Sequence, residues 1–511
     1  MTFEPSKERR TRLQARLILF LGAASSLALA ACASLPPPNQ PVASKPVSAY
    51  AASQSFAAPT ADWPTDQWWK AYGDPQLDQL VAEALAGSPT MAAARARIDH
   101  ARADTGAIRA GLLPTLQGQA SAAESKQSYH AGIPPLFVPK GYNDTGGVRL
   151  DFSYEFDFWG KTRSAIAAAV SETRASQADA AEARLTLSTA VASAYADLAR
   201  LYAERDVAER SAQSRMETLD LVNRRVTNGL DTQGELKEAE AGVPAAKADL
   251  AAIDEQIATT RNQLAALAGA GPDRGLMIAR PAQASLKAFG LPQTLAADLI
   301  GRRPDVVAAK WRAEAAAKRI GVAKAQFYPD VNLTAFIGYQ SLYLRELFKA
   351  GSDIGQVGPA ISLPIFEGGR LRANLKGAEA DYASAVASYD GAVTQALLDV
   401  ADAAAGERAL GERLAQSREA LAGEEQAYRI ARQRYDGGLS NYQSVLIVED
   451  RVLASRRTVV DLEARAFTLD IQLVKSLGGG FADAGMQRMA GGFADAGAQR
   501  MAGRFADAAT Q

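Results

Sequence analysis

The chain has 511 residues, a formal net charge of −1, one cysteine and two histidines. This length exceeds that of one ordinary domain, so we expect several domains or an internal duplication. The near-zero charge, with no long basic run after the first sixteen residues, argues against nucleic acid as a partner. No stretch after residue 31 contains about eighteen consecutive apolar residues, so no membrane-spanning helix is expected there.

The N-terminus has the pattern of a secretory signal. Basic residues precede a short apolar run that ends in Leu-Ala-Ala-Cys, which predicts a lipoprotein signal peptide over residues 1–31. Cys32 is the only cysteine, which excludes an intrachain disulfide, and we expect it to carry a covalent lipid such as palmitate. The alternative is a plain signal peptide followed by a chance cysteine. Residues 32–66, rich in Pro, Ala and Ser, predict a lipidated N-terminus and extended tether.

The remainder repeats one pattern in tandem. Pro89 and Pro114 enclose a predicted helix, Pro304 and Pro329 enclose its counterpart, and both intervals are 25 residues. Glycine-containing turns recur later in the same order, which indicates duplication. We therefore predict a first repeat over residues 67–270, an inter-repeat linker over 271–291, a second repeat over 292–478 and a low-complexity C-terminal tail over 479–511.

Each repeat contains one predicted β-hairpin, over residues 115–159 and 330–366. Apolar and polar residues alternate without a break over residues 148–158, a length that fits a tilted membrane-spanning strand. A half-buried strand of a soluble sheet has the same pattern. The polar side carries Arg149, Asp151, Glu155 and Asp157, which we expect to face the lumen of a barrel. The other predicted strands are 115–123, 332–340 and 357–366.

Four strands cannot close a barrel, and an open sheet edge cannot lie in lipid. If these strands span a membrane, several chains must therefore pool them: two chains give eight strands and three give twelve.

Long helices fill the rest of each repeat. Residues 161–226 contain no proline and predict one helix of about 99 Å. The shorter predicted helices, 90–112 and 231–267, together reach about 91 Å. Two short helices stacked beside one long helix form a rod that must project into aqueous space. Tight turns at Gly229 and Gly438 then lie at the far end from the strands, although each glycine is also simply the residue that ends a helix.

Several motifs carry a family resemblance. The segments Trp-Trp-Lys-Ala-Tyr from residue 68, Arg303-Pro304-Asp305, Phe-Tyr-Pro from residue 327, and Leu-Pro-Ile-Phe-Glu-Gly-Gly from residue 363 resemble the TolC/OprM family of outer-membrane efflux proteins, in its lipoprotein (NodT-like) branch. The resemblance covers about residues 68–480.

The resemblance implies a mainly α fold with a membrane β part: two tandem repeats, a long α-helical barrel, and four strands per chain contributing to a trimeric 12-stranded β-barrel. It implies a passive exit duct for small molecules in the cell outer membrane, lipid-anchored and projecting into the periplasm. The implied partners are a periplasmic adaptor protein and an inner-membrane efflux pump, which open the closed periplasmic tip.

The resemblance also assigns roles to residues near the turns. The turns that contact the adaptor contain Arg225, Gly229, Leu230, Arg434, Gly438 and Leu439. The periplasmic gate region contains Tyr435, Ser444 and Ile447. Family members commonly place aspartates where this chain has Ser444 and Ile447, so a more apolar gate is expected. The rival hypothesis is that Glu449 or Asp450 supplies an acidic ring instead.

No pattern in the chain predicts catalysis. The two histidines lack metal-ligand spacing, and neither a Gly-x-Ser-x-Gly elbow nor a phosphate-binding loop occurs, so we expect neither an enzyme nor a cofactor besides the lipid. Two alternatives stay open: an outer-membrane duct for type I protein secretion, and a periplasmic scaffold lipoprotein. The sequence does not identify the transported substrate or the class of pump.

Overall fold

The computed structural model describes residues 42–46, 49–51, 54–130, 134–282, 286, 289–292 and 295–483. The predicted signal peptide, Cys32 and all of the C-terminal tail beyond residue 483 lie outside the described residues. The chain divides into two compact units. The strand-bearing unit contains Asp99–Arg174 and Lys310–Ala387. The helical unit contains the described residues of Ser44–Ile98, Ala175–Ala309 and the described part of the chain from Ser388 onward.

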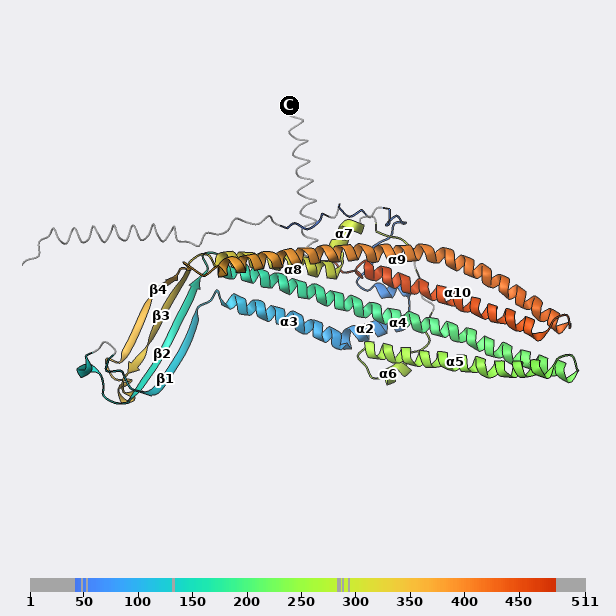
Figure 1. Ribbon diagram of the computed structural model, residues 1–511, viewed down its shortest axis with the longest axis horizontal. Helices are drawn as coiled ribbons and strands as arrows, with labels where there is room; N and C mark the ends of the chain where they lie inside the picture. The colour runs from blue at the N-terminus through green and yellow to red at the C-terminus, as the bar shows by residue number, and fades with distance from the viewer. Residues whose placement is uncertain are drawn as a thin grey trace, which may run out of the picture. The chain divides into compact units, whose positions relative to one another are not determined.

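The elements follow in chain order (Figure 1). In the first repeat they are η2 (Trp68–Tyr72), α2 (Pro75–Gly87), α3 (Pro89–Ala110), β1 (Thr115–Ser125), η3 (Pro135–Phe137), β2 (Asn143–Phe156), α4 (Lys161–Thr227), α5 (Gln233–Leu267) and α6 (Asp273–Leu276). In the second they are α7 (Leu295–Arg302), α8 (Pro304–Ala325), β3 (Asp330–Ser341), η4 (Leu344–Glu346), β4 (Asp353–Ser362), α9 (Arg370–Asp436) and α10 (Tyr442–Ser476). No helix among the described residues is both long and apolar enough to cross a bilayer.

The strands of the two repeats form one sheet. The order is β1-β2-β3-β4 and each neighbouring pair is antiparallel, so β1 and β4 are the edges (Figure 1). Three predicted strands are confirmed with small shifts of their ends. The fourth prediction, 357–366, was placed too late because β4 ends at Ser362, before Pro364. Pro364 lies just beyond the last paired residue, and it has no backbone N–H with which to continue the pairing of the strand.

Register divides the sheet into an apolar and a polar face. One row runs Leu116, Phe152, Ala335, Val357, and the adjacent row on that face includes Leu150 and Ile337. The large aliphatic side chains of this face are exposed: Leu116 is 68%, Ile337 69% and Val357 75% exposed. The opposite face carries a row of Gln117, Asp151, Phe336 and Gln356. The sheet therefore presents one face suited to lipid and one suited to water.

Asp157 does not continue β2 as the sequence predicted. The strand ends at Phe156, and the Asp157 carboxylate accepts backbone hydrogen bonds from Thr162 (3.2 Å) and Arg163 (2.9 Å) in the first turn of α4. This bonding holds its pKa below the usual range despite the opposing effect of burial. Asp157 therefore caps α4 instead of belonging to β2, because a carboxylate at a helix N-terminus satisfies amides that have no partner within the helix. Its place in a barrel lumen stays a prediction.

Two of the motifs that carried the resemblance lie in packed parts of the helical unit. Trp68 and Tyr72 are each 4% exposed in a core that also includes residues of α2, α4 and α10. Arg303 is buried and forms ion pairs with Asp305 (2.6 Å) and Asp399 of α9 (2.7 Å). These contacts tie the start of α8 to α9, since a buried guanidinium requires charged partners.

The predicted tether is packed where it is described. Phe56 and Trp63 lie against a buried cluster formed by α7, α9 and the end of α10. Leu291 exchanges backbone hydrogen bonds with the N-terminal segment, donating to Pro59 (2.8 Å) and accepting from Ala61 (3.0 Å). Residues of the predicted tether are therefore packed against the helices where they are described, because their aromatic side chains bury apolar area there.

Candidate gate and channel-lining site

The two helical turns expected to meet a partner have the same geometry. Gly229 and Gly438 both have φ of 71°, and the amides of Leu230 and Leu439 donate to the carbonyls of Arg225 (2.8 Å) and Arg434 (2.7 Å). This pattern ends a helix through a left-handed residue, which glycine adopts without strain. Both leucines project into solvent, at 64% and 72% exposure, as a contacting role requires.

A cross-repeat lock joins the two turns. The guanidinium of Arg225 binds the Asp231 carboxylate through Nε (3.0 Å) and Nη2 (3.1 Å), and its Nη1 donates to the Tyr435 carbonyl (3.0 Å). The Tyr435 hydroxyl donates to Asp231, and its ring lies 4.5 Å from the Arg225 guanidinium carbon. We call Arg225, Asp231 and Tyr435 the turn lock.

The lock is buried. Tyr435 is 1% exposed and packs with Val222, Ala239, Tyr442 and Val445, which come from both repeats. Burial, together with the hydrogen bond to Asp231, raises the pKa of Tyr435, so the hydroxyl stays a donor at neutral pH. Tyr435 was placed in the gate region from sequence; the structure shows that it fastens one turn to the other from inside the chain.

Among the residues that the structure describes, the second turn has no equivalent ion pair. Asp231 follows Gly229 by two residues, and the same place after Gly438 holds Ser440. Arg434 is exposed, whereas its counterpart Arg225 is largely buried. The sequence analysis assigned the same role to both turns. The difference between Asp231 in the first turn and Ser440 in the second was the signal that could have distinguished them.

The first turns of α10 present the predicted gate residues to solvent. The Asn441 side chain caps this helix by accepting from the Ser444 amide (3.1 Å) and hydroxyl (2.7 Å). Ile447 is 49% exposed and lies on the same side of the helix as Ser444, while Tyr442 and Val445 are buried. The structure therefore keeps Ser444 and Ile447 together on an unpacked surface.

Glu449 does not lie on that surface. It is 3% exposed, and Arg215 of α4 approaches it at 3.4 Å while also binding Asp450 at 2.5 Å. Burial raises the pKa of Glu449 despite this cation. The rival hypothesis is therefore wrong for Glu449, because its carboxylate points into the chain. Asp450 is exposed, but it is paired with Arg215.

The polar face of the sheet carries linked side chains. Arg149 binds Asp151 (3.0 Å) and Gln119 of β1 (3.0 Å), and its guanidinium carbon lies 5.9 Å from the Phe336 ring centre. Glu155 accepts from Lys161 at the start of α4 (3.0 Å). Arg149, Asp151 and Glu155 thus share the face predicted for a lumen.

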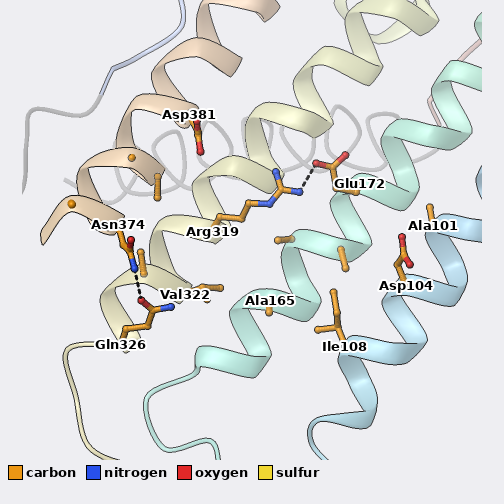
Figure 2. A pocket seen from close by; sticks show the side chains of 16 residues that line it. Ala101, Asp104, Ile108, Ala165, Glu172, Arg319, Val322, Gln326, Asn374 and Asp381 are labelled. Atoms are coloured by element: carbon orange, nitrogen blue, oxygen red, sulfur yellow. Dashed lines mark hydrogen bonds and ion pairs between the residues drawn. The ribbon is translucent and has the colours of Figure 1, made fainter. Parts of the chain in front are cut away.

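Below the sheet, helices of both repeats surround an open hollow of about 680 Å³. Figure 2 shows Arg319 of α8 reaching Glu172 of α4, an ion pair of 2.8 Å, and Asn374 of α9 donating to Gln326 at 3.4 Å. Most other lining residues are alanines. No group of carboxylates, histidines or cysteines that could hold a metal occurs among the described residues. The hollow therefore offers a wall of small and polar side chains rather than a convergent set of reactive groups.

Comparison with known proteins identifies the family to which this chain belongs. The family model described as "Outer membrane efflux protein" matches residues 80–270 and 295–479. The chain belongs to the outer membrane efflux protein family. The fusaric acid resistance protein FusA of Burkholderia cepacia is 39% identical, over 70% of this chain and 68% of that protein. The multidrug resistance outer membrane protein MdtP of Escherichia coli K12 is 33% identical, over 83% and 88%.

A solved structure shows the same fold. The outer membrane protein VceC of Vibrio cholerae is 45% identical, with a TM-score of 0.76 over 82% of this chain and all of that one. The resemblance inferred from sequence and the fold class of a helical, strand-bearing efflux channel are thus confirmed. The chain is an outer membrane efflux channel protein, and its family and structural neighbours are channel proteins rather than enzymes.

Proposed function

We propose that three copies of this chain form a closed duct: a 12-stranded β-barrel in the outer membrane above a long α-helical barrel in the periplasm. In this duct, small molecules leave passively after an inner-membrane pump and a periplasmic adaptor protein deliver them. The single observation that supports this assembly best is the sheet, which has two open edges and an exposed apolar face.

The edges require partners in a membrane. The outer edges of β1 and β4 leave backbone N–H and C=O groups without strand partners among the described residues. Each such group costs several kcal/mol in hydrocarbon, so only closure removes the penalty. The strands have 11, 14, 12 and 10 residues, and about 9–11 tilted residues span a bilayer. Twelve strands are within the known range of membrane barrels.

The gate belongs to the opposite end of the helices. The turn lock holds the two turns of one chain together, and the exposed Ser444 and Ile447 of three chains form the narrow ring. Leu230 and Leu439, exposed beside the turns, give an adaptor two equivalent apolar contacts. An adaptor that binds the unlocked turns more tightly than the locked turns shifts the equilibrium toward the open duct, and the size of the shift is set by the difference between the two affinities.

We further propose that Cys32 carries the lipid that anchors the chain to the outer membrane. The support is the Leu-Ala-Ala-Cys sequence that ends the apolar run. Cys32→Ala should abolish labelling by radioactive palmitate in growing cells, and persistent labelling of this variant would exclude the anchor.

The assembly is tested on the purified full-length protein. Native mass spectrometry should give the mass of three chains, and planar-bilayer recordings should show a low resting conductance that rises when the adaptor is added. A stable monomer that inserts into bilayers without assembling would contradict the proposal.

A further inference from the structure

Two adjacent carboxylates of α10 lie close to the predicted gate residues. Asp450 follows Ile447 by three residues, so the two side chains are neighbours on one side of the helix. Both are solvent-exposed, the Asp450 side chain at 63%, whereas Glu449 is buried. The exposed side of α10 therefore changes from an apolar residue to a carboxylate within one helical turn.

A single cation from the first repeat contacts both carboxylates. The Arg215 guanidinium of α4 donates to Asp450 through Nη2 at 2.5 Å, and its Nη1 lies 3.4 Å from Glu449. The Arg215 side chain is only 10% exposed, and a Cβ at Gly242 of α5 would lie 3.5 Å from its Cδ. Arg215 is thus packed between helices, and its guanidinium reaches Asp450 from inside the chain.

The charges of this group leave Asp450 as the residue that matters for the exposed surface. Burial raises the pKa of Glu449 despite the nearby Arg215 charge, which favours the neutral form of that carboxyl group. The exposed negative charge beside Ile447 is then that of Asp450, and the guanidinium at 2.5 Å cancels it.

We propose that Arg215 sets the charge selectivity of the duct by cancelling the Asp450 carboxylate one helical turn from the Ile447 ring. In the proposed trimer, on which this selectivity rests, three copies of Ile447 form the narrow ring and three copies of Asp450 lie beside it. With Arg215 in place, these residues give the constriction no preference for cations over anions. Without Arg215, three like charges surround a narrow aqueous passage, and such a passage concentrates ions of the opposite sign.

A purely structural role for Arg215 predicts different measurements. An ion pair between α4 and α10 also holds the two helices together, so its loss changes the total conductance of the channel. Loss of helix contact does not distinguish ions by the sign of their charge. An unmasked carboxylate does, and it changes the ratio of cation to anion permeability.

The test measures reversal potentials of the purified full-length protein in planar bilayers under a KCl gradient, and native mass spectrometry verifies that each variant is a trimer. Arg215→Gln should raise the ratio of K⁺ to Cl⁻ permeability at least about threefold over the wild type. Adding Asp450→Asn to this variant should return the ratio to the wild-type value. Adding Glu449→Gln instead should leave the ratio raised, because Asp450 is still present.

A second single variant tests the same ion pair from its exposed side. Asp450→Asn alone changes a solvent-exposed side chain, so it places little demand on the fold. The Arg215 charge then has no exposed partner on α10, and the permeability ratio should shift in the opposite direction, toward anions. A ratio that moves toward cations, or that stays at the wild-type value, would contradict the role of the pair.

Arg418→Gln is the matched control. It removes the cation from a similar pair between α9 and α10, in which Arg418 binds Glu463 at 2.7 Å. Glu463 lies sixteen residues beyond Ile447, about 24 Å along the helix. This distance exceeds the Debye length of about 10 Å at about 0.1 M salt, so the permeability ratio should stay unchanged. At about 1 M salt the effect of Arg215→Gln should also shrink, since the Debye length falls to about 3 Å.

The outcomes separate this role of Arg215 from the proposed duct. A wild-type ratio in Arg215→Gln would overturn the role, and so would a raised ratio that persists after Asp450→Asn is added or that Arg418→Gln reproduces. Each of these results is obtained on conducting trimers, so the duct itself stands. If neither the wild type nor any variant forms trimers that carry current, the proposed function fails instead.

Discussion

Removal of the Tyr435 hydroxyl tests the turn lock with the smallest change. Tyr435→Phe keeps the ring, its packing with Tyr442 and its contact with the Arg225 guanidinium, and it deletes only the hydrogen bond to Asp231. A hydrogen bond to a charged group contributes about 1.5–3 kcal/mol. Asp231 keeps its two bonds from Arg225, so it is not left unpaired, and we expect the lower end of that range.

A loss of about 1.5 kcal/mol corresponds to a roughly tenfold larger population of the unlocked turns. Hydrogen exchange should accelerate about tenfold in peptides that cover the two turns and stay unchanged in α2, which lies in a separate buried core. Tyr428→Phe is the matched control, because Tyr428 is on the same helix and packs beside this cluster without contacting Asp231. Exchange in Tyr435→Phe that equals the wild type would refute the lock.

Three further predictions concern the second turn, the ring and the helical core. Ser440→Asp gives Arg434 the acidic partner that Arg225 has, so resting conductance in planar bilayers should fall and exchange at this turn should slow; unchanged values would show that the asymmetry has no effect. Ile447→Asp places like charges in the apolar ring, so resting conductance should rise, and wild-type conductance would rule out an apolar seal. Arg303→Met leaves two carboxylates without their cation and should lower the free energy of unfolding by about 2 kcal/mol. This loss is smaller than for a fully buried pair because both carboxylates are partly exposed. A denaturant midpoint equal to that of the wild type would contradict this role.

The sequence predicted the elements that have strong periodic signals. The helix of residues 161–226 was placed within one residue of α4, because 67 residues without an internal proline keep the helical pattern. The strand pattern was correct until Phe156, and it failed at Asp157 because a helix cap and a strand residue look alike in an alternating sequence. The alternation of apolar and polar residues does not show whether Asp157 is a strand residue or a helix cap, because that depends on its hydrogen bonds to Thr162 and Arg163.

Contacts between distant segments could not be predicted. The turn lock joins Arg225 to Tyr435, and nothing local to either residue indicates that they meet. The sequence left open whether Glu449 contributes to an acidic ring, and the packing of α10 on α4 buries it. The packed N-terminal segment was missed for the same reason, since its composition is that of a linker while its few aromatic residues find a surface in the folded chain.

Cross-linking of the sheet edges tests the closed trimer most directly. Gln117 of β1 and Gln356 of β4 lie on the polar face at the two open edges, so a barrel brings one chain's β1 beside its neighbour's β4. Chains with Gln117→Cys plus a single cysteine at 354, 356 or 358 should give oxidised dimers and trimers on denaturing gels, most strongly at one register. Thr115→Cys with Ser153→Cys, paired within one chain, is the control and should give only monomer. Monomer alone from every edge pair would contradict the duct.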